Sequence, residues 1–307
     1  MKVFFDFKKV KQLKRPVVAL GVFDGVHQGH RRIISAAVKK AKTTGGRSVV
    51  VTFCPHPQKE ESLYSLSHRL KIIESLGVEA CIVIKFNRAF AAITAEDFIK
   101  KIIAAKIGAK YVYVGKNFRF GRRAKGGLKL LRELSGIYGF RIKAFDVVKT
   151  ARLPISSTYI RKLIKAGELR KAERLLVHPV CILGTVIRGA SLARKLGFPT
   201  ANIDPHHEVL PPSGVYAVRV ILKNKIYKGV CSIGTKPTLT GKNIQHIEVH
   251  IFSLRSDIYG EYLEIQFIQK IRDQKKFRSL PALAQKIKKD VIQAKRMFFS
   301  PQIRHKL

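Results

Sequence analysis

The first half of the chain alternates between two patterns of apolar residues. Short and almost continuous apolar runs predict buried strands at 17–20, 48–53, 81–86, 111–115 and 141–148. Between these runs, apolar residues recur at helical spacing and predict helices over 31–42, 68–76, 95–107 and 128–137. Strands that alternate with helices form a parallel sheet with helices on both faces, so an α/β fold is expected here.

The pattern changes near residue 180. A short helix is expected to end at Leu176, and His178-Pro179 then breaks it, which predicts one domain over 1–179 and a second over 180–307. Runs rich in β-branched residues follow, at 181–187, 215–222, 227–232, 244–252 and 262–268. Turn residues separate them, so we expect an antiparallel barrel or sandwich. An amphipathic helix over 280–297 is expected to pack on it.

Composition places this chain among cytoplasmic globular proteins. No run of eighteen apolar residues occurs, so no membrane-spanning segment is expected. Lysines break up the N-terminal stretch, which lacks the apolar centre of a signal peptide. The four cysteines have no C-x-x-C spacing, and this favours reduced thiols that act as small core residues.

The chain is unusually basic. Sixty Lys and Arg stand against twenty Asp and Glu, a formal net charge of +40 that would attract polyanions. These residues are spread along the whole chain, without a basic tail or a nucleic-acid-binding signature. We therefore expect a general lysine bias and no specific nucleic acid partner. An RNA-binding protein remains the alternative from another functional class, and the sequence leaves the oligomeric state unknown.

The stretch Gly21-Val22-Phe23-Asp24-Gly25-Val26-His27-Gln28-Gly29-His30 carries the first candidate site. It joins a predicted strand to a predicted helix, whose N-terminus offers free N–H groups and a positive dipole end. Its glycines allow close approach of the backbone, and His27 and His30 lie three residues apart. The pattern indicates a phosphate site. A purely structural turn is the main alternative. A zinc site is disfavoured, because no further metal ligands stand nearby in the sequence.

Three later stretches of the same half also follow predicted strands or begin a helix. The proline-flanked loop at 52–57 could aim His56 into a cleft, or His56 could be an idle surface residue. The stretch at 114–121 brings Asn117 between two glycines, with Phe118 and Phe120 as stacking or core residues. The run at 155–161 is rich in capping hydroxyls and predicts a second anion-binding helix start.

In their order and spacing, GVFDGVHQGH, TFCPHP, VGKNFRFG and ISSTYIR resemble the N-terminal module of bifunctional riboflavin kinase/FAD synthetases. The resemblance implies a Rossmann-like nucleotidyltransferase fold and transfer of an adenylyl group from ATP to FMN, which yields FAD and pyrophosphate. It makes His27 and His30 the catalytic residues. It implies ATP or phosphate binding by Gly21, Phe23, Asp24, Gly25, Gly29, Asn117, Ser156, Ser157, Thr158 and Arg161.

The second half holds a separate polar cluster. Thr200 and Asn202, two apart in an extended segment, point to the same side, and their oxygens suit Mg²⁺. A turn with self-bonded Thr and Asn is the alternative. Glu248 stands inside an apolar strand, where an unpaired charge is costly, so it needs a partner or a function. A simple pair with His250, which shares its face of the strand, is the structural alternative.

This half resembles the riboflavin kinase module of the same family through GTVIRG, LGFPTANI, GVYAV, SIGTKPT, IEVHIF and DIYG. The resemblance implies γ-phosphate transfer from ATP to riboflavin, with Thr200 and Asn202 as ligands of the Mg²⁺–nucleotide and Glu248 as the base. It implies nucleotide or flavin binding by Gly184, Gly189, Gly197, Pro199 and Arg272.

The expected function is a cytoplasmic enzyme that converts riboflavin to FMN and then to FAD, with ATP as co-substrate and Mg²⁺ as cofactor. Ala193 stands where the family often has Gly, and Gln274 where it usually has Glu. These departures leave an alternative, an FAD synthetase with an impaired kinase half. Adenylyl transfer to another phosphorylated acceptor is a further alternative, because the first half of the chain, with its HxGH motif, does not by itself specify which molecule accepts the adenylyl group.

Overall fold

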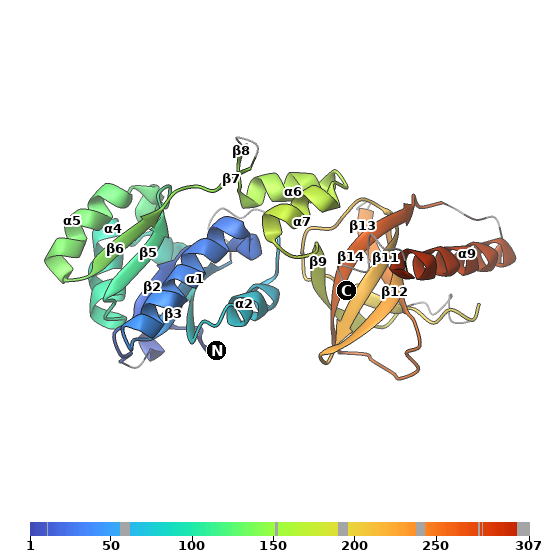
Figure 1. The fold of residues 1–307 in the computed structure, drawn as a ribbon, viewed down its shortest axis with the longest axis horizontal. Coiled ribbons are helices and arrows are strands. Elements are labelled where there is room, and N and C mark those ends of the chain that lie inside the picture. Colours follow the sequence, from blue (N-terminus) through green and yellow to red (C-terminus); the bar gives the residue numbers. More distant parts are fainter. Residues whose placement is uncertain are drawn as a thin grey trace. The chain divides into compact units, whose positions relative to one another are not determined.

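The computed structural model describes residues 1–10, 12–55, 62–150, 153–189, 196–237, 243–275, 277 and 279–299. The chain divides into two compact units, Met1–Tyr159 and Ile160–Leu307, which we describe separately (Figure 1). This division comes earlier in the chain than the boundary expected at 179, which stays a prediction. His56 and Ala193 lie outside the described residues.

The first unit is built on a six-stranded parallel sheet in the order β1-β4-β3-β2-β5-β6 (Figure 1). The strands are β1 (Lys2–Phe4), β2 (Val17–Leu20), β3 (Ser48–Cys54), β4 (Ala80–Lys85), β5 (Tyr111–Gly115) and β6 (Arg141–Phe145). The five predicted strands are present, although β6 ends three residues early. The prediction missed β1, because three residues with one lysine give no apolar run.

Helices cover both faces of this sheet, as the sequence predicted. The helical segments are α1 (Gln28–Thr43), α2 (Leu66–Ser75), α3 (Arg88–Ala91), α4 (Ala95–Asp97), the π-helix η3 (Phe98–Lys106) and α5 (Leu128–Tyr138). Alternate residues of β2 face different cores: Val17 and Ala19 pack with α1 and α2, whereas Val18 and Leu20 pack with η3 and α5. Short turns η1 (Phe7–Lys9), η2 (Asp24–Val26) and η4 (Arg122–Ala124) and the hairpin β7 (Lys149–Thr150) and β8 (Leu153–Pro154) complete the unit.

The second unit is a closed antiparallel barrel in the order β10-β13-β12-β11-β14-β9, which decides between the predicted barrel and sandwich. Its strands are β9 (Cys181–Ile187), β10 (Ala201–Asp204), β11 (Gly214–Leu222), β12 (Lys225–Pro237), β13 (Asn243–Ile251) and β14 (Tyr262–Arg272). The prediction missed β10, since its four residues carry no alternating pattern. Helix α6 (Ser157–Lys165) runs into this unit from the first and α7 (Leu169–Leu176) precedes the barrel.

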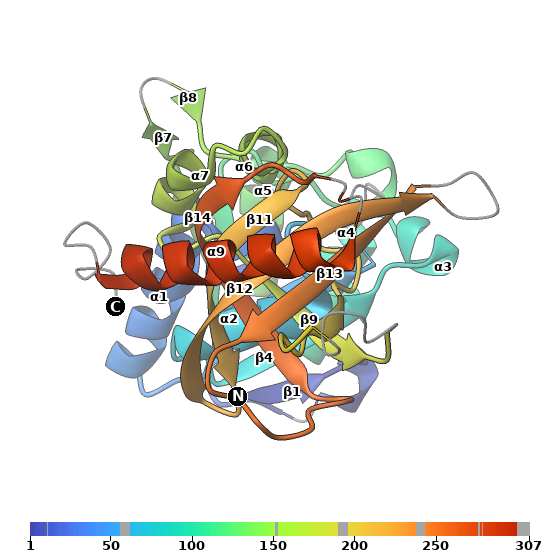
Figure 2. The same ribbon diagram turned by 90° about the vertical axis from the view of Figure 1, so that its right-hand side faces the viewer.

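The C-terminal helix α9 (Leu280–Phe299) lies across the barrel strands (Figure 2). Ala294 and Phe298 of this helix are buried against Val215, Ala217 and Val230. The predicted packing of an amphipathic helix on the second half is therefore confirmed. The apolar side expected from helical spacing is only partly correct, because Ile292 is exposed and Asp290 is buried.

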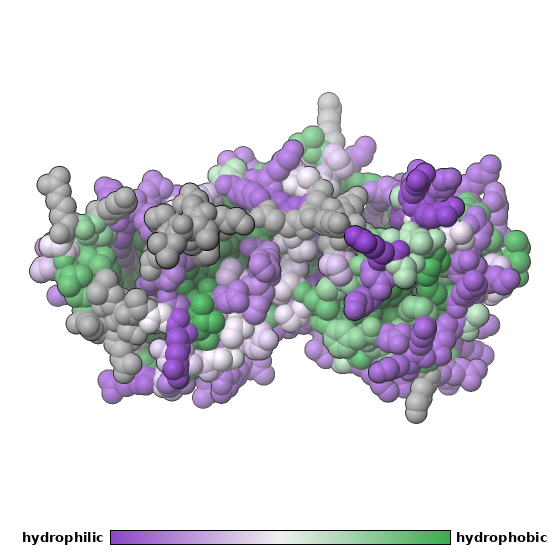
Figure 3. All heavy atoms as spheres, turned by 180° about the vertical axis from the view of Figure 1, so that it is seen from behind, coloured by the Kyte–Doolittle hydropathy of each residue, from purple (hydrophilic) through white to green (hydrophobic). Residues whose placement is uncertain are grey.

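The surface agrees with the diffuse charge of the sequence. On the face drawn in Figure 3, hydrophilic residues are spread over both units, with apolar residues between them. Within the described part of the chain, no helix combines the length and apolarity needed to cross a membrane. All four cysteines are unpaired, and Cys81, Cys181 and Cys231 are buried, which confirms the core position expected of the thiols.

Candidate active sites

The first candidate site is the turn between β2 and α1. Helix α1 begins at Gln28, so His27 is its N-cap residue and His30 lies in its first turn. Phe23 and Val26 both adopt left-handed backbone angles, with φ of 54° and 38°, which side chains rarely tolerate. Strain of this kind persists where surrounding structure enforces it, and it concentrates at functional sites. At Gly25 a Cβ would lie 2.4 Å from Leu63 Cδ1, so no side chain fits there.

The two imidazoles lie face to face in this turn. Their ring centroids are 3.6 Å apart at an interplanar angle of 20°, and the Phe23 ring meets His30 edge-on at 5.3 Å. The Nδ1 atoms of His27 and His30 are buried and lack a hydrogen-bond partner among the described residues. Such orphaned polar atoms cost stability, so their presence favours a site that is completed by a ligand.

Both imidazoles are neutral at neutral pH. Burial lowers the pKa of His27 from 6.5 to about 4. Burial also lowers the pKa of His30, and the neighbouring His27 and Arg69 lower it further. Each neutral ring offers one N–H donor and one acceptor nitrogen. An incoming polyphosphate would favour protonation and so would strengthen its own binding.

The buried His27 predicts a loss of stability in acid. Because its pKa is about 4 in the folded chain and 6.5 unfolded, the unfolded chain takes up the proton first as pH falls. Between these pH values His27 alone is expected to lower the free energy of unfolding of the first unit by about 3 kcal/mol. Urea unfolding at pH 7 and pH 4.5 measures this drop in the free energy of unfolding. Hydrogen exchange of peptides from β2 and α1 is the readout for the first unit. The His27→Ala variant should show a smaller drop, and an equal drop in both proteins would contradict this pKa.

Other predicted residues of this half hold the turn in place. The Asp24 carboxylate is buried, and its Oδ1 accepts a hydrogen bond from the Leu63 N–H at 2.8 Å. The Ser157 hydroxyl donates to the Asp24 carbonyl at 2.8 Å, and the Ser156 hydroxyl caps α6 by accepting from the Tyr159 N–H at 3.2 Å. Both serines therefore have structural partners. Thr158 and Arg161 lie further along α6, and the Arg161 side chain is buried.

Of the remaining residues singled out in this half, some lie beside the turn and others belong to the hydrophobic core. Asn117 follows β5 and folds back over Gly115, where a Cβ would lie 3.0 Å from Asn117 Oδ1. The rings of Phe118 and Phe120 stack at 5.6 Å and belong to the core beneath the sheet, which favours their structural role. Gly21 and Gly29 lie against the rings of Phe23 and His27, where a Cβ would have only 3.0 Å and 3.3 Å of room.

The second candidate site is on the barrel. Strand β10 pairs with β13 in a register that sets Asn202 opposite Glu248. Thr200, just before β10, donates a hydrogen bond from its hydroxyl to Glu248 Oε2 at 3.4 Å. The Asn202 Oδ1 atom is buried and has no hydrogen-bond partner in the described part of the chain. The structure thus brings together the three side chains that the sequence singled out.

The histidine beside Glu248 is His246 and not the His250 of the structural alternative. His246 Nδ1 lies 3.3 Å from Glu248 Oε1, whereas His250 Nδ1 contacts the Pro199 carbonyl oxygen at 2.8 Å. Both histidines are two residues from Glu248 on the same strand, so the spacing could not separate them. The Phe198 ring packs edge-on against the His250 ring, and the Pro199 carbonyl contacts the His250 Nδ1 atom.

A pocket of about 500 Å³ opens beside Thr200 and Pro199. Asp257 and Tyr259 line its other side. Two of the predicted glycines, Gly184 within β9 and Gly189 just after it, permit close approach to β10. A Cβ at Gly189 would lie 2.0 Å from Asn202 Nδ2, and one at Gly184 would lie 2.3 Å from Ile203 Cγ2. Gly197 adopts a φ of 83°, which a glycine tolerates and most residues do not.

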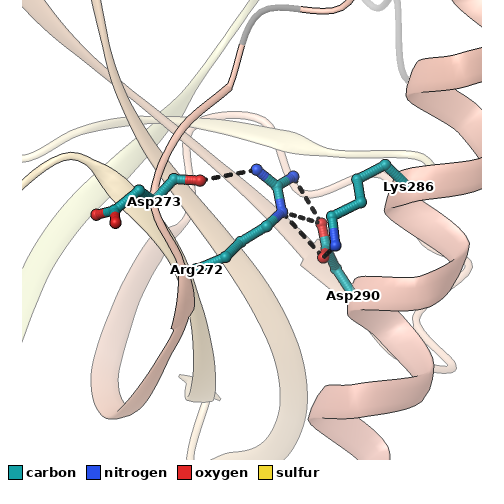
Figure 4. A network of polar contacts seen from close by, with 4 residues as sticks. All are labelled: Arg272, Asp273, Lys286 and Asp290. Atoms are coloured by element: carbon teal, nitrogen blue, oxygen red, sulfur yellow. Dashed lines mark hydrogen bonds and ion pairs between the residues drawn. The ribbon is translucent and has the colours of Figure 1, made fainter.

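Arg272, the last predicted residue, binds within the protein (Figure 4). Its Nε lies 3.0 Å from both Asp290 carboxylate oxygens, its Nη2 donates to Oδ2 at 2.7 Å, and its Nη1 donates to the Asp273 carbonyl at 3.0 Å. Asp290 is 2% exposed and also faces Lys286 at 3.4 Å. Arg272 therefore fastens α9 to β14. Gln274, the departure from the family pattern, packs against Gly234.

Removal of this clamp is expected to loosen the barrel. Arg272→Met leaves a buried carboxylate without its main partner, which typically costs about 3–5 kcal/mol. Lys286→Met is the matched control, because its ion pair is longer and more exposed, and it should cost under about 1 kcal/mol. Hydrogen exchange of peptides from β14 and α9 measures both. Equal exchange in the two variants would show that the Arg272–Asp290 pair is not the stronger anchor.

Comparison with known proteins agrees with this division. The FAD synthetase family model matches residues 9–159, and the riboflavin kinase family model matches residues 176–298. The bifunctional riboflavin kinase/FMN adenylyltransferase of Buchnera aphidicola subsp. Schizaphis graminum is 34% identical over 97% of this chain and 99% of its own. The proteins of that name from Escherichia coli (strain K12) and Bacillus subtilis (strain 168) are each 35% identical over 92% of this chain, and 92% and 93% of their own.

The chain belongs to the bifunctional riboflavin kinase/FMN adenylyltransferase family. It is an enzyme with two activities, which phosphorylates riboflavin to FMN and adenylylates FMN to FAD, with ATP as substrate in both reactions. A crystal structure described as a macrolide-efflux protein from Streptococcus pneumoniae shares this fold, with a TM-score of 0.81 and 30% identity over 95% of this chain and 98% of its own.

Within this family assignment, three residues of the sites were missed from the sequence. Arg69 is a buried cation in the adenylyltransferase unit. His246 is the histidine beside Glu248, and Asp290 is the carboxylate that pairs with Arg272. Arg69 and Asp290 lie in ordinary amphipathic helices, where a charged residue is expected on the outer face. Helical spacing places them four residues before the buried Ile73 and Ala294, but the sequence could not identify the partners that make the burial of a charge possible.

Proposed function

We propose that His27 and His30 are the catalytic residues of FMN adenylyl transfer. Their unpartnered Nδ1 atoms at the N-terminus of α1 are the observation that carries the proposal. Two imidazoles there can donate to the ATP phosphates and stabilise the charge that develops as the FMN phosphate attacks the α-phosphate. Direct transfer needs no covalent intermediate, so positioning and charge stabilisation provide the catalysis.

The supporting roles in this unit follow from the contacts. Asp24, Gly21, Phe23, Gly25 and Gly29 shape the strained turn rather than bind ATP through their side chains. Ser157 holds the Asp24 carbonyl, so its contribution to phosphate binding would be indirect. Asn117, Thr158 and Arg161 retain the proposed role of nucleotide and phosphate ligands on the resemblance alone.

For the kinase unit we propose that Glu248 accepts the proton of the attacking riboflavin hydroxyl. A carboxylate within hydrogen-bond reach of its substrate can contribute a substantial factor as a general base. Thr200 and Asn202 would hold Mg²⁺, because Asn202 Oδ1 is a buried oxygen without a partner among the described residues and Thr200 adds a hydroxyl beside it. When bound, Mg²⁺ would draw charge from the transferring phosphoryl group.

The kinase proposal is tested by the Mg²⁺ requirement. Asn202→Ala should raise the Mg²⁺ concentration needed for half-maximal riboflavin phosphorylation, at fixed ATP, by about tenfold, since one oxygen ligand is lost. FMN adenylylation by the same protein is the internal control and should keep its Mg²⁺ requirement. An unchanged requirement for both reactions would remove Asn202 from the ligand set. Product formation is followed by chromatographic separation of riboflavin, FMN and FAD.

We also propose that the protein acts in the cytoplasm and has no specific nucleic acid partner, in spite of its +40 charge. The support is the unpaired state of its cysteines and the diffuse spread of hydrophilic residues. Filter binding of the purified enzyme to RNA at rising salt checks the second statement. Binding that survives physiological salt would contradict it, because nonspecific electrostatic binding weakens steeply with salt.

A further inference from the structure

Arg69 of α2 is a buried cation in the adenylyltransferase unit. It is 4% exposed, its Nη1 donates to the Val22 carbonyl at 2.7 Å, and its Nη2 donates to the Phe53 carbonyl at 3.0 Å. Its Nε is buried and has no hydrogen-bond partner among the described residues. Because an apolar residue of the same volume would avoid the desolvation cost, stability alone gives no reason for a guanidinium here.

The two carbonyls belong to adjacent strand ends. Val22 lies two residues beyond the end of β2 and precedes the left-handed Phe23, and Phe53 is the last residue but one of β3. The Val22 carbonyl also accepts a hydrogen bond from the Thr52 hydroxyl at 2.8 Å. Ligands of open parallel sheets bind beyond the carboxyl ends of the strands. The planar guanidinium of Arg69 therefore links the end of β3 to the segment after β2, where the turn that carries His27 and His30 begins.

The contacts continue from these carbonyls to the imidazoles. Phe23, next to Val22, packs edge-on against the His30 ring, which stacks on His27. The charge of Arg69 is close enough to lower the pKa of His30, and the Asp24 carboxylate in turn acts on Arg69. A change at Arg69 would therefore move or recharge the two rings without touching them directly.

We propose that Arg69 is a positioning residue of FMN adenylyl transfer, which fixes the ends of β2 and β3 so that His27 and His30 face the ATP phosphates. This inference rests on the proposed role of the two histidines. Misplacement of catalytic groups by about 1 Å can cost about 100-fold in rate. Arg69 itself lies beneath the turn and contacts backbone, so it acts through the histidines.

The test compares Arg69→Met with Leu131→Ala, a fully buried residue of α5 whose core cluster does not include Phe23 or Val26 of the turn. Both variants lose packing or polar contacts and are expected to melt at lower temperature. At a temperature where circular dichroism shows both folded, Arg69→Met should lower kcat for FAD formation about 10- to 100-fold, and Leu131→Ala should leave it within about twofold. Equal kcat values in the two variants would overturn the proposal.

A double-mutant cycle with His30→Ala distinguishes action through the histidine from an independent effect. If Arg69 acts through His30, Arg69→Met should lower kcat by less than about threefold in the His30→Ala background. A full multiplicative loss there would overturn the inference. A His30→Ala variant with normal kcat would instead refute the proposed function itself. Riboflavin phosphorylation, carried by the other unit, reports on the amount of active protein throughout.

Should Arg69→Met not fold, Thr52→Val provides the second variant. It removes the other donor to the Val22 carbonyl while keeping the shape of a fully buried side chain. We expect kcat for FAD formation to fall about threefold, because one of two hydrogen bonds that fix the strand end is lost. A kcat equal to that of the unmodified enzyme would overturn the proposal that these carbonyl contacts position the site.

Discussion

Replacing His27 or His30 with alanine should lower FAD formation from FMN by at least about 100-fold, the usual loss when one donor to a developing charge is removed. The two rings stack at 3.6 Å and share one turn, so either loss also disturbs the other ring. The double variant should therefore be little worse than either single variant. Chromatography of the flavins formed from FMN, ATP and Mg²⁺ measures all three.

His207→Ala is the matched control for these variants, because His207 is an exposed histidine of the other unit. It should leave FAD formation unchanged. Phosphorylation of riboflavin by the His27 and His30 variants should also be unchanged. If either variant formed FAD at more than about a tenth of the normal rate, the histidines would bind ATP without contributing to the chemical step.

Glu248→Gln should produce the reverse pattern. It keeps the size of the side chain and its hydrogen bond to Thr200 but removes the base, so riboflavin phosphorylation should fall about 100- to 10,000-fold. Adenylylation of added FMN should continue at the normal rate. The assay is the same flavin separation, started from riboflavin in one sample and from FMN in the other.

Glu261→Gln serves as its control, since Glu261 pairs with Lys223 at a half-exposed position of the same unit. It should phosphorylate riboflavin normally. A Glu248→Gln variant with a near-normal rate would show that the hydroxyl proton leaves to solvent or to the phosphate, as a dissociative transfer allows. In that case the contact between Glu248 and His246 would be structural.

The sequence predicted the fold where the apolar pattern was long enough. Strands such as β2 and β5 were placed to the residue, because continuous buried runs are bounded by turns. The short strands β1 and β10 were missed, since three or four residues cannot display a period. Thr200 and Asn202 were nonetheless found, because their chemistry rather than their strand drew attention.

The sequence marks the proposed catalytic residues but not the residues that support them. His27, His30 and Glu248 stand out in local motifs. The bonds that hold them come from residues distant in sequence: Arg69 reaches Val22 across 47 positions, and Ser157 reaches Asp24 across 133. The same limit holds at Arg272, whose ion pair with Asp290 was not foreseen from the sequence. Tertiary partners of this kind leave no periodic signal in one chain.

The strand order of the first unit also bears on aggregation. A sheet with open edges can pair with other molecules, and both edges here are protected. Edge strand β1 has only three residues and starts with exposed Lys2, and edge strand β6 exposes Arg141 and Lys143. The closed barrel has no edge at all. Native molecules are therefore poor templates for intermolecular strand pairing through these two sheets, and pairing of that kind is expected to begin from unfolded chains.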